Sequence, residues 1–436
     1  MTDPIVALDR AHIWHPFTQE STAPDPVPIE SADGAVLRTR DGREILDLIS
    51  SWWVNLHGHA HPHMAAAIAE QATNLEQVIF AGFTHEPAAR LAGALADRLP
   101  GDLSRVFFSD DGSTSVEVAL KLATQYWANR GRTRNRFLCF EGGYHGDTVG
   151  AMSVGASSGF FDVFRSLLFP VDALPFPSTW EGDEAVEDKE NQALAALDAY
   201  LDRHGAETAA LIMEPLVQGA GGMRMCRPAF IRALAERLRA ADVLLIFDEV
   251  MTGFGRTGAL FAGERAGAAP DIVCLSKGLT GGYLPMSVTV CTPNIYAAFL
   301  DADFDKAFTH GHSFTANPLA CAAALASLEL LEQERSLERV RAMEVLHRQR
   351  FAELAEHPRA HRWRVTGSIA ALDVQASDGG YGSAVGPWLK QFYLERGLLI
   401  RPLGNVVYLM PPYCVDDEQL ERAYRGIAKS LEEMPV

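Results

Sequence analysis

The chain has 436 residues, 48% of them hydrophobic, which is enough for two or three domains with a large core. Its formal net charge of −18 argues against nucleic acid or an anionic membrane as the main partner, because both demand clustered Lys and Arg. No run reaches the roughly 18 apolar residues of a membrane span, no signal peptide is expected, and six singly spaced cysteines are typical of a reduced cytoplasmic protein.

The N-terminal segment combines a proline-rich stretch with a hairpin signal. Residues 1–30 contain several prolines and predict irregular structure. Residues 36–38 and 45–48 then flank Asp41-Gly42, a pair that is typical of a tight β-hairpin turn. We therefore expect a hairpin before residue 50.

Two adjacent tryptophans, Trp52 and Trp53, precede a run of alternating histidines. The tryptophans predict either core packing or an aromatic wall for an apolar substrate. On a strand the histidines would share one face, as metal ligands do, but Gly58 and Pro62 disfavour a strand and no acid or cysteine is nearby. We expect no metal site at these residues, which are His57, His59, His61 and His63.

A phosphate site is predicted where a strand over 106–108 runs into Gly112-Ser113-Thr114. Two helices, over 65–75 and 87–99, precede that strand. The helix that follows has an apolar stripe at Val116, Leu120, Ala123 and Trp127. Free N–H groups and the positive end of a helix favour an anion, although Asp110 and Asp111 would have to point away. Plain N-capping by Ser113 or Thr114 is the alternative interpretation.

The next predicted strand, over 137–140, runs into a glycine-rich segment around Tyr144. Glycines beside an aromatic residue at a strand end let the ring lie flat on a planar ligand. Residues 171–195 mix Pro, Asp and Glu without a period and predict a surface loop. A strand over 209–213 and a helix over 230–240 follow.

The chemistry centres on two short apolar runs. Residues 243–247 end in Asp248-Glu249, and residues 272–275 end in Ser276-Lys277. Each run predicts a buried parallel strand, and ligands bind outside the carboxyl ends of such strands. Asp248 and Lys277 are therefore expected at one edge of one sheet. A pyridoxal phosphate enzyme needs both groups, a lysine to bind the aldehyde and an acid to hold the pyridine nitrogen protonated.

Other classes use similar strings. An apolar run ending in two acids resembles a Walker B strand, but the chain lacks the G-x-x-x-x-G-K-[ST] string that an ATPase needs. The residues Gly253 to Gly258 match G-x-G-x-x-G, yet no helical pattern opens at Gly258, which disfavours a nicotinamide oxidoreductase. A surface lysine in a non-catalytic binding protein is a further alternative, although lysine is seldom buried without a task.

The C-terminal part changes character. A strand over 286–291 is followed by the segment 310–318 and a helix over 319–334. The remainder predicts a smaller α+β domain with a strand over 364–374, a helix over 387–396, short strands at 399–401 and 406–410, and a final helix capped by Asp416 with Gln419.

These motifs carry a family resemblance over essentially the whole chain. The chain resembles the class III (ω-) aminotransferases of the fold-type I pyridoxal phosphate enzymes, in the strings Tyr144–Gly146, Ile246–Gly258 and Ser276–Gly278. The resemblance implies an α/β fold with a mostly parallel sheet in a large domain and a smaller α+β domain. Residues 1–60 would join the small domain, 61–318 would form the large one, and 319–436 the C-terminal small domain.

Further strings resemble one branch of that family, which converts 8-amino-7-oxononanoate to 7,8-diaminononanoate in biotin biosynthesis, with S-adenosylmethionine as amino donor. They are Ile13–Pro16, Trp52–Trp53, Glu214–Met223, Asn317–Cys321, Ile400–Pro402 and Tyr408–Pro412. Another class III ω-amino acid or diamine aminotransferase is the alternative, and a glutamate-semialdehyde-type aminomutase is a third. A long apolar substrate ending in a carboxylate would explain both the tryptophan pair and Arg401.

The resemblance implies roles toward pyridoxal 5'-phosphate. Lys277 would be the catalytic residue that binds the cofactor covalently and then moves protons. Asp248 would pair with the pyridine nitrogen, and Tyr144 would stack on the ring. The phosphate would be held by Gly112 and Ser113 and, from a partner subunit, by Gly311, His312 and Ser313, so the active unit would be a homodimer.

It also implies a substrate pocket. Trp52 and Trp53 would line it, Arg401 would bind the substrate carboxylate through its planar fork, and Asp147 and Arg256 would tune donor recognition. Phe17, Tyr144 and Gly311 would complete the pocket.

Two positions depart from the family pattern. Phe17 stands where the best-known members have tyrosine, so a hydroxyl that could bond the substrate amine is missing. The phosphate segment commonly reads Gly-Pro-Thr and reads Gly311-His312-Ser313 here, which keeps a hydroxyl.

Overall fold

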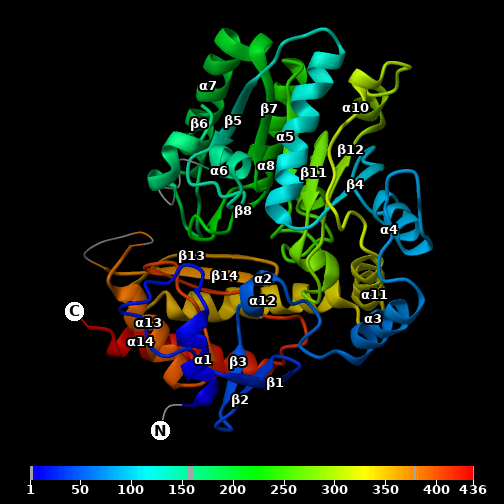
Figure 1. Ribbon diagram of the computed structural model, residues 1–436. Helices are drawn as coiled ribbons and strands as arrows, with labels where there is room; N and C mark the ends of the chain where they lie inside the picture. Colours follow the sequence, from blue (N-terminus) through cyan, green and yellow to red (C-terminus); the bar gives the residue numbers. More distant parts are fainter. Residues whose placement is uncertain (1–2, 156–160, 377–379, 381, 436) are drawn as a thin grey trace.

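The computed structural model describes residues 3–155, 161–376, 380 and 382–435. Figure 1 shows an upper body around a large sheet and a lower body that holds both chain ends. Among the described helices, none is long and apolar enough to cross a membrane. The helices are α1 Pro4–His12, α2 Ser50–Trp53, α3 Pro62–Asn74, α4 Glu86–Ala96, α5 Gly112–Asn129, α6 Val149–Val154, α7 Val186–His204, α8 Pro228–Ala240, α9 Ala262–Ala266, α10 Pro293–Ala297, α11 Pro318–Gln333, α12 Ser336–Leu354, α13 Val385–Glu395 and α14 Asp417–Glu433.

The upper body is built on a seven-stranded sheet in the order β4-β12-β11-β10-β7-β5-β6. In that order the strands are Arg105–Ser109, Ser287–Cys291, Ile272–Leu275, Leu244–Asp248, Thr208–Met213, Arg136–Phe140 and Asp172–Leu174. Neighbours from β11 to β6 are parallel, whereas β12 runs antiparallel to both β11 and β4. The predicted α/β fold with a mostly parallel sheet is confirmed.

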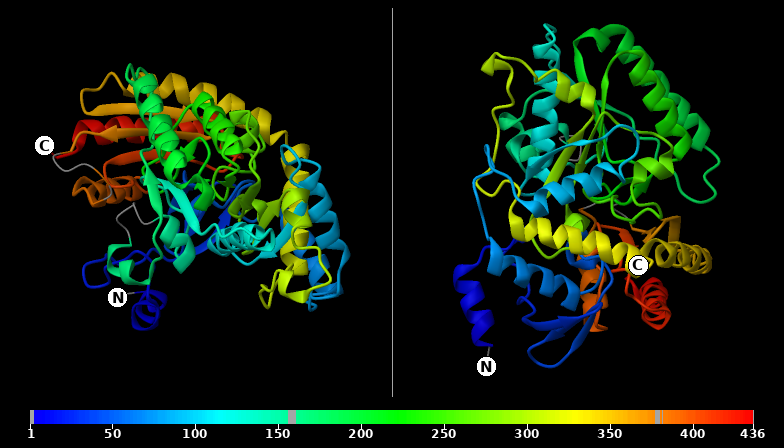
Figure 2. Two further views of the ribbon diagram at one scale, coloured as in Figure 1. Left: turned by 90° about the horizontal axis from the view of Figure 1, so that it is seen from above. Right: turned by 90° about the vertical axis from the view of Figure 1, so that its right-hand side faces the viewer.

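Alternating side chains of β10 show how helices cover both faces of this sheet. Leu244 and Ile246 pack in one core cluster with α5, whereas Leu245 and Phe247 pack in another with α8. Successive strand side chains point to opposite faces, so a fully buried strand needs cover on both sides. In the right-hand view of Figure 2, α5 stands on one side of the strands, and α7 and α8 stand on the other.

The lower body joins both ends of the chain. One sheet has the order β1-β2-β3-β15, in which β3 pairs in parallel with β15, and an antiparallel sheet has the order β13-β14-β16. α12, α13 and α14 pack in the same core cluster as these sheets. The domain limits at residues 60 and 318 stay a prediction. The remaining strands are β1 Ile29–Asp33, β2 Val36–Thr39, β3 Glu44–Asp47, β8 Val217–Gln218, β9 Arg224–Met225, β13 Ala360–Thr366, β14 Ile369–Val374, β15 Leu398–Leu399 and β16 Val406–Leu409.

The predicted turn signals are confirmed, but the prediction of irregular structure over residues 1–30 is wrong. β2 and β3 pair around Asp41-Gly42, and Asp416 with Gln419 forms the capping box of α14. Residues 4–12, however, form α1, which begins with a proline after the cap Asp3. Proline is favourable at the first helical position, where its missing N–H has no helical partner.

Two further predictions are wrong. The expected loop over 171–195 contains β6, which pairs with β5, and the start of α7. The buried residues of α7 are Glu190, Ala193, Leu197 and Tyr200, so the stripe begins with an acid and its first turns show no apolar period in the sequence.

The expected single strand over 364–374 is a hairpin of β13 and β14, which turns at Gly367 with a φ of +55°. A side chain at Gly367 would clash with the carbonyl oxygen of Arg256.

Candidate active site

The carboxyl edge of the large sheet brings Asp248 and Lys277 together. Asp248 ends β10, and Lys277 follows its parallel neighbour β11 in a left-handed conformation, with a φ of +47°. Burial lowers the pKa of Lys277, and the charges of Asp248 and Glu214 oppose that shift. A fraction of the amine is therefore neutral nearer to neutral pH than in a solvated lysine, as a nucleophile requires.

Asp248 is held by two donors. Its Oδ2 lies 2.7 Å from Nδ1 of His145, and its Oδ1 accepts from the backbone N–H of Val250 at 3.0 Å. Burial, the largest single effect, opposes a charged His145, but the hydrogen bond to Asp248 and the charges of Asp248 and Glu214 together raise the pKa of His145. His145 is a functional residue that the sequence reasoning missed, although it lies in the string Tyr144–Gly146. It keeps the carboxylate in one orientation.

Gly112 and Ser113 open α5, where the phosphate site was predicted, but the cap of this helix was predicted wrongly. Asp111 is the N-cap of α5, not Ser113 or Thr114, since its carboxylate accepts from Thr114 N at 2.9 Å and from Ser113 Oγ at 2.7 Å. Asp111 therefore does not point away from the helix end, as an anion would require. A side chain at Gly112 would lie 2.8 Å from Cγ1 of Val250, so only glycine fits there.

A cavity of about 210 Å³ opens beside Lys277. Seven predicted residues line it: Phe17, Trp52, Trp53, Tyr144, Asp147, Lys277 and Arg401. Ala220, Leu403 and Tyr408 also line it and were not predicted as site residues. Ala220 and Tyr408 lie in strings that resemble the family, but no residue-type signal distinguishes Leu403 from an ordinary core leucine.

The two tryptophans take different places in this cavity. Trp53 is buried, its Nε1 donates to the Tyr408 hydroxyl at 2.9 Å, and its ring centre lies 4.8 Å from Lys277 Nζ. Trp52 is 42% exposed, and the Arg401 guanidinium lies 4.4 Å from its ring centre. The ring centre of Phe17 lies 5.7 Å from that of Trp52. Trp52 and Trp53 thus form an aromatic wall, with the Lys277 amine at Trp53 and the Arg401 guanidinium at Trp52.

Tyr144 is fixed from its backbone and from its hydroxyl. Its N–H donates to Glu214 Oε2 at 3.1 Å, and its ring stacks on Phe161 with centres 6.1 Å apart. Burial raises the pKa of Tyr144, and so do the negative charge of Asp147 and the hydrogen bond to it. The phenol therefore stays protonated at neutral pH. Tyr144 therefore presents a hydrogen-bond donor toward Asp147.

Arg256 does not line the cavity. It is 1% exposed and donates to the carbonyl oxygens of Pro411 and Asn55, each at 2.8 Å, and to that of Trp53 at 3.5 Å. Burial lowers the pKa of Arg256. Its contacts in this chain are with backbone that carries Trp53, rather than with the space a substrate would fill.

The segment Gly311–Ser313 also lies outside the cavity lining of its own chain. The Ser313 carbonyl accepts from Gln77 Nε2 at 3.0 Å, and His312 Nδ1 lies 3.9 Å from Asp110 Oδ2.

The four alternating histidines do not share one face as on a strand, although the ring centres of His57 and His61 lie 6.4 Å apart. Three of the four have acidic partners, which the sequence reasoning did not foresee. The pairs are His57–Ser327, His59–Asp47, His61–Glu334 and His63–Glu329.

The chain is similar to known proteins over almost its full length. A family model described as aminotransferase class-III matches residues 17–431. The adenosylmethionine-8-amino-7-oxononanoate aminotransferase of Synechococcus elongatus is 57% identical, over 97% of this chain and 99% of the relative. The crystal structure of the enzyme of that name from Methanocaldococcus jannaschii is 34% identical, with a TM-score of 0.92 over 99% of both chains. A PLP-bound amine transaminase from an uncultivated Pseudomonas species is 31% identical, with a TM-score of 0.88 over 96% of this chain and 97% of that one.

Proposed function

The chain belongs to the class III aminotransferase family, and from this premise we propose that it converts 8-amino-7-oxononanoate to 7,8-diaminononanoate, with S-adenosylmethionine as amino donor, in biotin biosynthesis. The relative that is 57% identical carries the name of that reaction. One observation carries the proposal: the contacts Lys277–Trp53 and Trp52–Arg401 line one cavity. A substrate with a reactive nitrogen or ketone, an apolar chain and a terminal carboxylate matches that series of groups.

The residues present fit pyridoxal 5'-phosphate. Lys277 supplies an amine whose pKa burial has lowered, and Asp248 supplies a carboxylate held in place by His145. The N-terminus of the 18-residue helix α5 would supply the N–H groups of Gly112 and Ser113 once the Asp111 carboxylate, which accepts from the Ser113 hydroxyl, turns away. When bound, the cofactor would act as an electron sink for the substrate carbon.

The other residues bind and orient. Lys277 would take a proton from the substrate carbon and return one on the far side of the transferred nitrogen, a 1,3-shift, and buried Trp53 beside its amine would exclude water. Arg401 would fix the carboxylate end of the substrate. With Phe17 in the cavity in place of a tyrosine, the phenol oxygen of Tyr144, whose proton is bonded to Asp147, would accept a hydrogen bond from the substrate amine.

We further propose a homodimer in the cytoplasm, in which Gly311, His312 and Ser313 of one copy complete the phosphate site of the other. Exposed apolar side chains lie beside that segment: Phe314 follows it directly, and Ile79 and Phe83 lie on the loop of Gln77, which bonds to Ser313. Large exposed apolar side chains on segments that bond to each other would suit a subunit interface.

The test is a half-reaction. Purified protein loaded with pyridoxal phosphate is mixed with 7,8-diaminononanoate alone, and the visible band of the bound cofactor is followed. Rapid loss of the band supports the assignment, and repeating the experiment with S-adenosylmethionine and with lysine identifies the donor. A stable band would indicate an aminotransferase that does not use this substrate, and a panel of ω-amino acids and diamines would then be tested. If neither the wild type nor Lys277→Ala shows the band, the assignment of pyridoxal phosphate as the cofactor is wrong.

A further inference from the structure

The carboxylate of Glu214 lies beside the groups of the site and touches its backbone, but it does not line the cavity. Glu214 directly follows β7, which lies between β10, the strand of Asp248, and β5, the strand that leads to Tyr144. Its side chain is 6% exposed, and no ion pair to a Lys or Arg is found for it in the described part of the chain. Burying a carboxylate without a Lys or Arg partner is unfavourable in free energy, so its presence here needs a structural reason.

Both oxygens of this carboxylate hold backbone of the cavity wall. Oε2 accepts from the N–H of Tyr144 at 3.1 Å, and Oε1 accepts from the N–H of Gly219 at 2.9 Å. Tyr144 lines the cavity, and so does Ala220, which follows Gly219. One side chain therefore holds together two loops that both contribute to the cavity lining.

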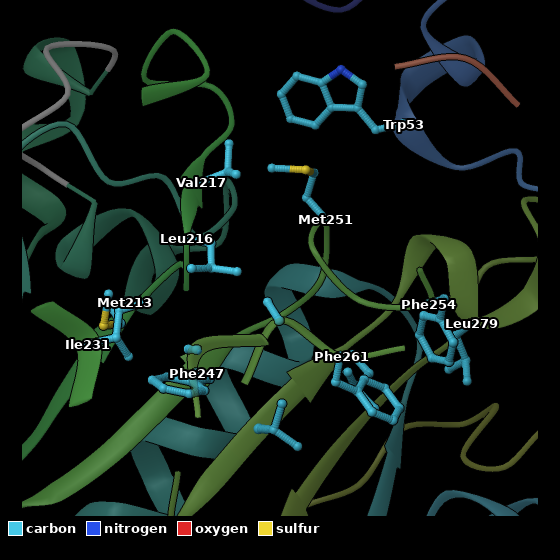
Figure 3. Close-up of a cluster of buried hydrophobic side chains, with 14 of the residues drawn as sticks. Trp53, Met213, Leu216, Val217, Ile231, Phe247, Met251, Phe254, Phe261 and Leu279 are labelled. Atoms are coloured by element: carbon cyan, nitrogen blue, oxygen red, sulfur yellow. The ribbon is translucent and has the colours of Figure 1, made fainter. Parts of the chain in front are cut away.

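The loop that Glu214 holds is tightly packed against Trp53. A side chain at Gly219 would lie 3.1 Å from Cζ3 of Trp53 and 3.0 Å from Cε of Met251. Figure 3 shows Met251 between Val217 of this loop and Trp53. A small displacement of the loop would therefore move the indole that contacts Lys277.

Glu214 also acts through its charge. It faces His145 and Asp248, it favours the protonated form of Lys277 as Asp248 does, and it favours the charged form of Arg224. Burial raises the pKa of Glu214 to about 7, opposed by His145 and by the two backbone N–H groups. Removing its charge would leave Asp248 as the one carboxylate that holds the proton on Lys277.

We propose that Glu214 is a positioning residue for the amino transfer, which fixes Tyr144 and Gly219 about the cavity and supplies, beside Asp248, the second negative charge that keeps Lys277 protonated. The proposal rests on the proposed function, because it assumes that Lys277 binds pyridoxal phosphate. The neutral substitution Glu214→Gln keeps the size of the side chain, removes the charge and can accept through only one atom.

Glu249 offers a matched control. It too is a buried acid whose carboxylate accepts from two backbone N–H groups, of Ala262 at 2.6 Å and Gly263 at 2.9 Å, and burial raises its pKa to about 7. Glu249 does not line the cavity and has no resolved effect on the pKa of Lys277. Glu249→Gln therefore reports the cost of losing a buried carboxylate without the proposed effect on the site.

The experiment is a pH titration of the visible absorption band of bound pyridoxal phosphate, in wild type, Glu214→Gln and Glu249→Gln. We expect Glu214→Gln to move the midpoint down by about 1 pH unit or more, because one charge acting over about 12 Å at an effective dielectric of about 20 corresponds to about 1 pH unit and a nearer charge to more. Glu249→Gln should leave the midpoint in place. Thermal unfolding of the cofactor-free forms should show similar losses of Tm for both variants.

A third variant keeps the proposal testable if Glu214→Gln does not fold. Glu214→Asp retains the charge but is too short to reach both N–H groups, so its midpoint should match that of the wild type while pyridoxal phosphate dissociates faster. Equal midpoints in the wild type and Glu214→Gln, or a shifted midpoint in Glu214→Asp with unchanged dissociation, would overturn the proposal. A wild type without any band would instead overturn the function on which it rests.

Discussion

The Nζ atom of Lys277 lies 4.8 Å from the ring centre of Trp53. The same indole donates to the hydroxyl of Tyr408, and both residues of the pair have left-handed backbone, with φ of +66° at Trp53 and +47° at Lys277. Such conformations of non-glycine residues are each unfavourable by about 1–3 kcal/mol and persist where the surroundings hold them. The contact is therefore built into the fold by packing on both sides.

Replacing each tryptophan separates packing from substrate contact. Trp53→Leu should lower the free energy of unfolding by about 3 kcal/mol, because it removes a buried ring and its hydrogen bond. Trp52→Leu should change stability by less than about 1 kcal/mol and instead raise KM, because Trp52 is 42% exposed and contacts Arg401. Urea unfolding and steady-state kinetics on both variants check this. Equal stability losses in the two variants would contradict it.

Arg401 should recognise the carboxylate end of the substrate. Arg401→Ala removes a charge-assisted hydrogen-bonding partner, which is worth about 2–3 kcal/mol, so kcat/KM for 8-amino-7-oxononanoate should fall roughly 30–150-fold. The control is an uncharged methyl ester of the same substrate, for which wild type and variant should be nearly equal. A similar loss with the ester would mean that Arg401 only supports Trp52.

Arg256 is expected to act through the backbone. Arg256→Lys keeps the charge but cannot reach the carbonyl oxygens of Pro411 and Asn55 together, so stability should fall by about 2–4 kcal/mol. Exposed Arg335→Lys is the matched control and should have almost no effect. If Arg256→Lys unfolds like the wild type and changes only the preference among amino donors, the direct role first expected for Arg256 would return.

Phe17→Tyr should strengthen binding of the amine-bearing substrate. Phe17 is 56% exposed and lines the cavity, so a hydroxyl can be added without repacking a core. One new hydrogen bond of about 1 kcal/mol corresponds to a roughly fivefold lower KM, with an unchanged Tm. The comparison needs both S-adenosylmethionine and 8-amino-7-oxononanoate, because a change for one substrate alone shows which of them the hydroxyl meets.

Acid should destabilise the protein partly through His57. Burial lowers the pKa of His57 to about 3, while its Nε2 bonds to Ser327. The unfolded chain, with a His pKa of about 6.5, therefore binds the proton first. The stability that depends on neutral His57 is present above pH 6.5 and is lost as the pH falls toward 3, by up to about 1.4 kcal/mol per pH unit. Urea unfolding at pH 7, 6 and 5 should show a shallower decline for His57→Gln; parallel declines would rule this out.

The chemistry at strand ends could be predicted from sequence because it depends on local signals. Short apolar runs that end in Asp248 and Lys277 identify buried parallel strands, and parallel strands end at a common edge. The roles given to the individual site residues stay predictions. The cavity nevertheless gathers seven residues from separate segments that the family resemblance had grouped.

What the sequence did not reveal depends on contacts between distant segments. The side chain of His145 reaches Asp248, and that of Glu214 reaches the backbone N–H of Tyr144. Nothing in the sequence around either residue indicates these contacts. Arg256 was expected beside the cavity because the family resemblance implied a role in donor recognition, yet tertiary packing directs it to carbonyl oxygens. α7 was missed because its buried stripe begins with the acidic Glu190 and becomes apolar only at Ala193.

The parallel pairing of β3 with β15 has a consequence for synthesis of the chain. β3 ends at Asp47, three residues before α2 brings Trp52 and Trp53, and its partner is Leu398–Leu399. The Ser50 hydroxyl likewise donates to the carbonyl oxygen of Met410 at 2.8 Å. At about 5–20 residues per second, a ribosome needs roughly 20–70 s between these strands. Throughout that interval the tryptophan wall of a nascent chain lacks Leu398–Leu399, Arg401 and Tyr408, so the substrate pocket is completed only when nearly the whole polypeptide has been synthesised.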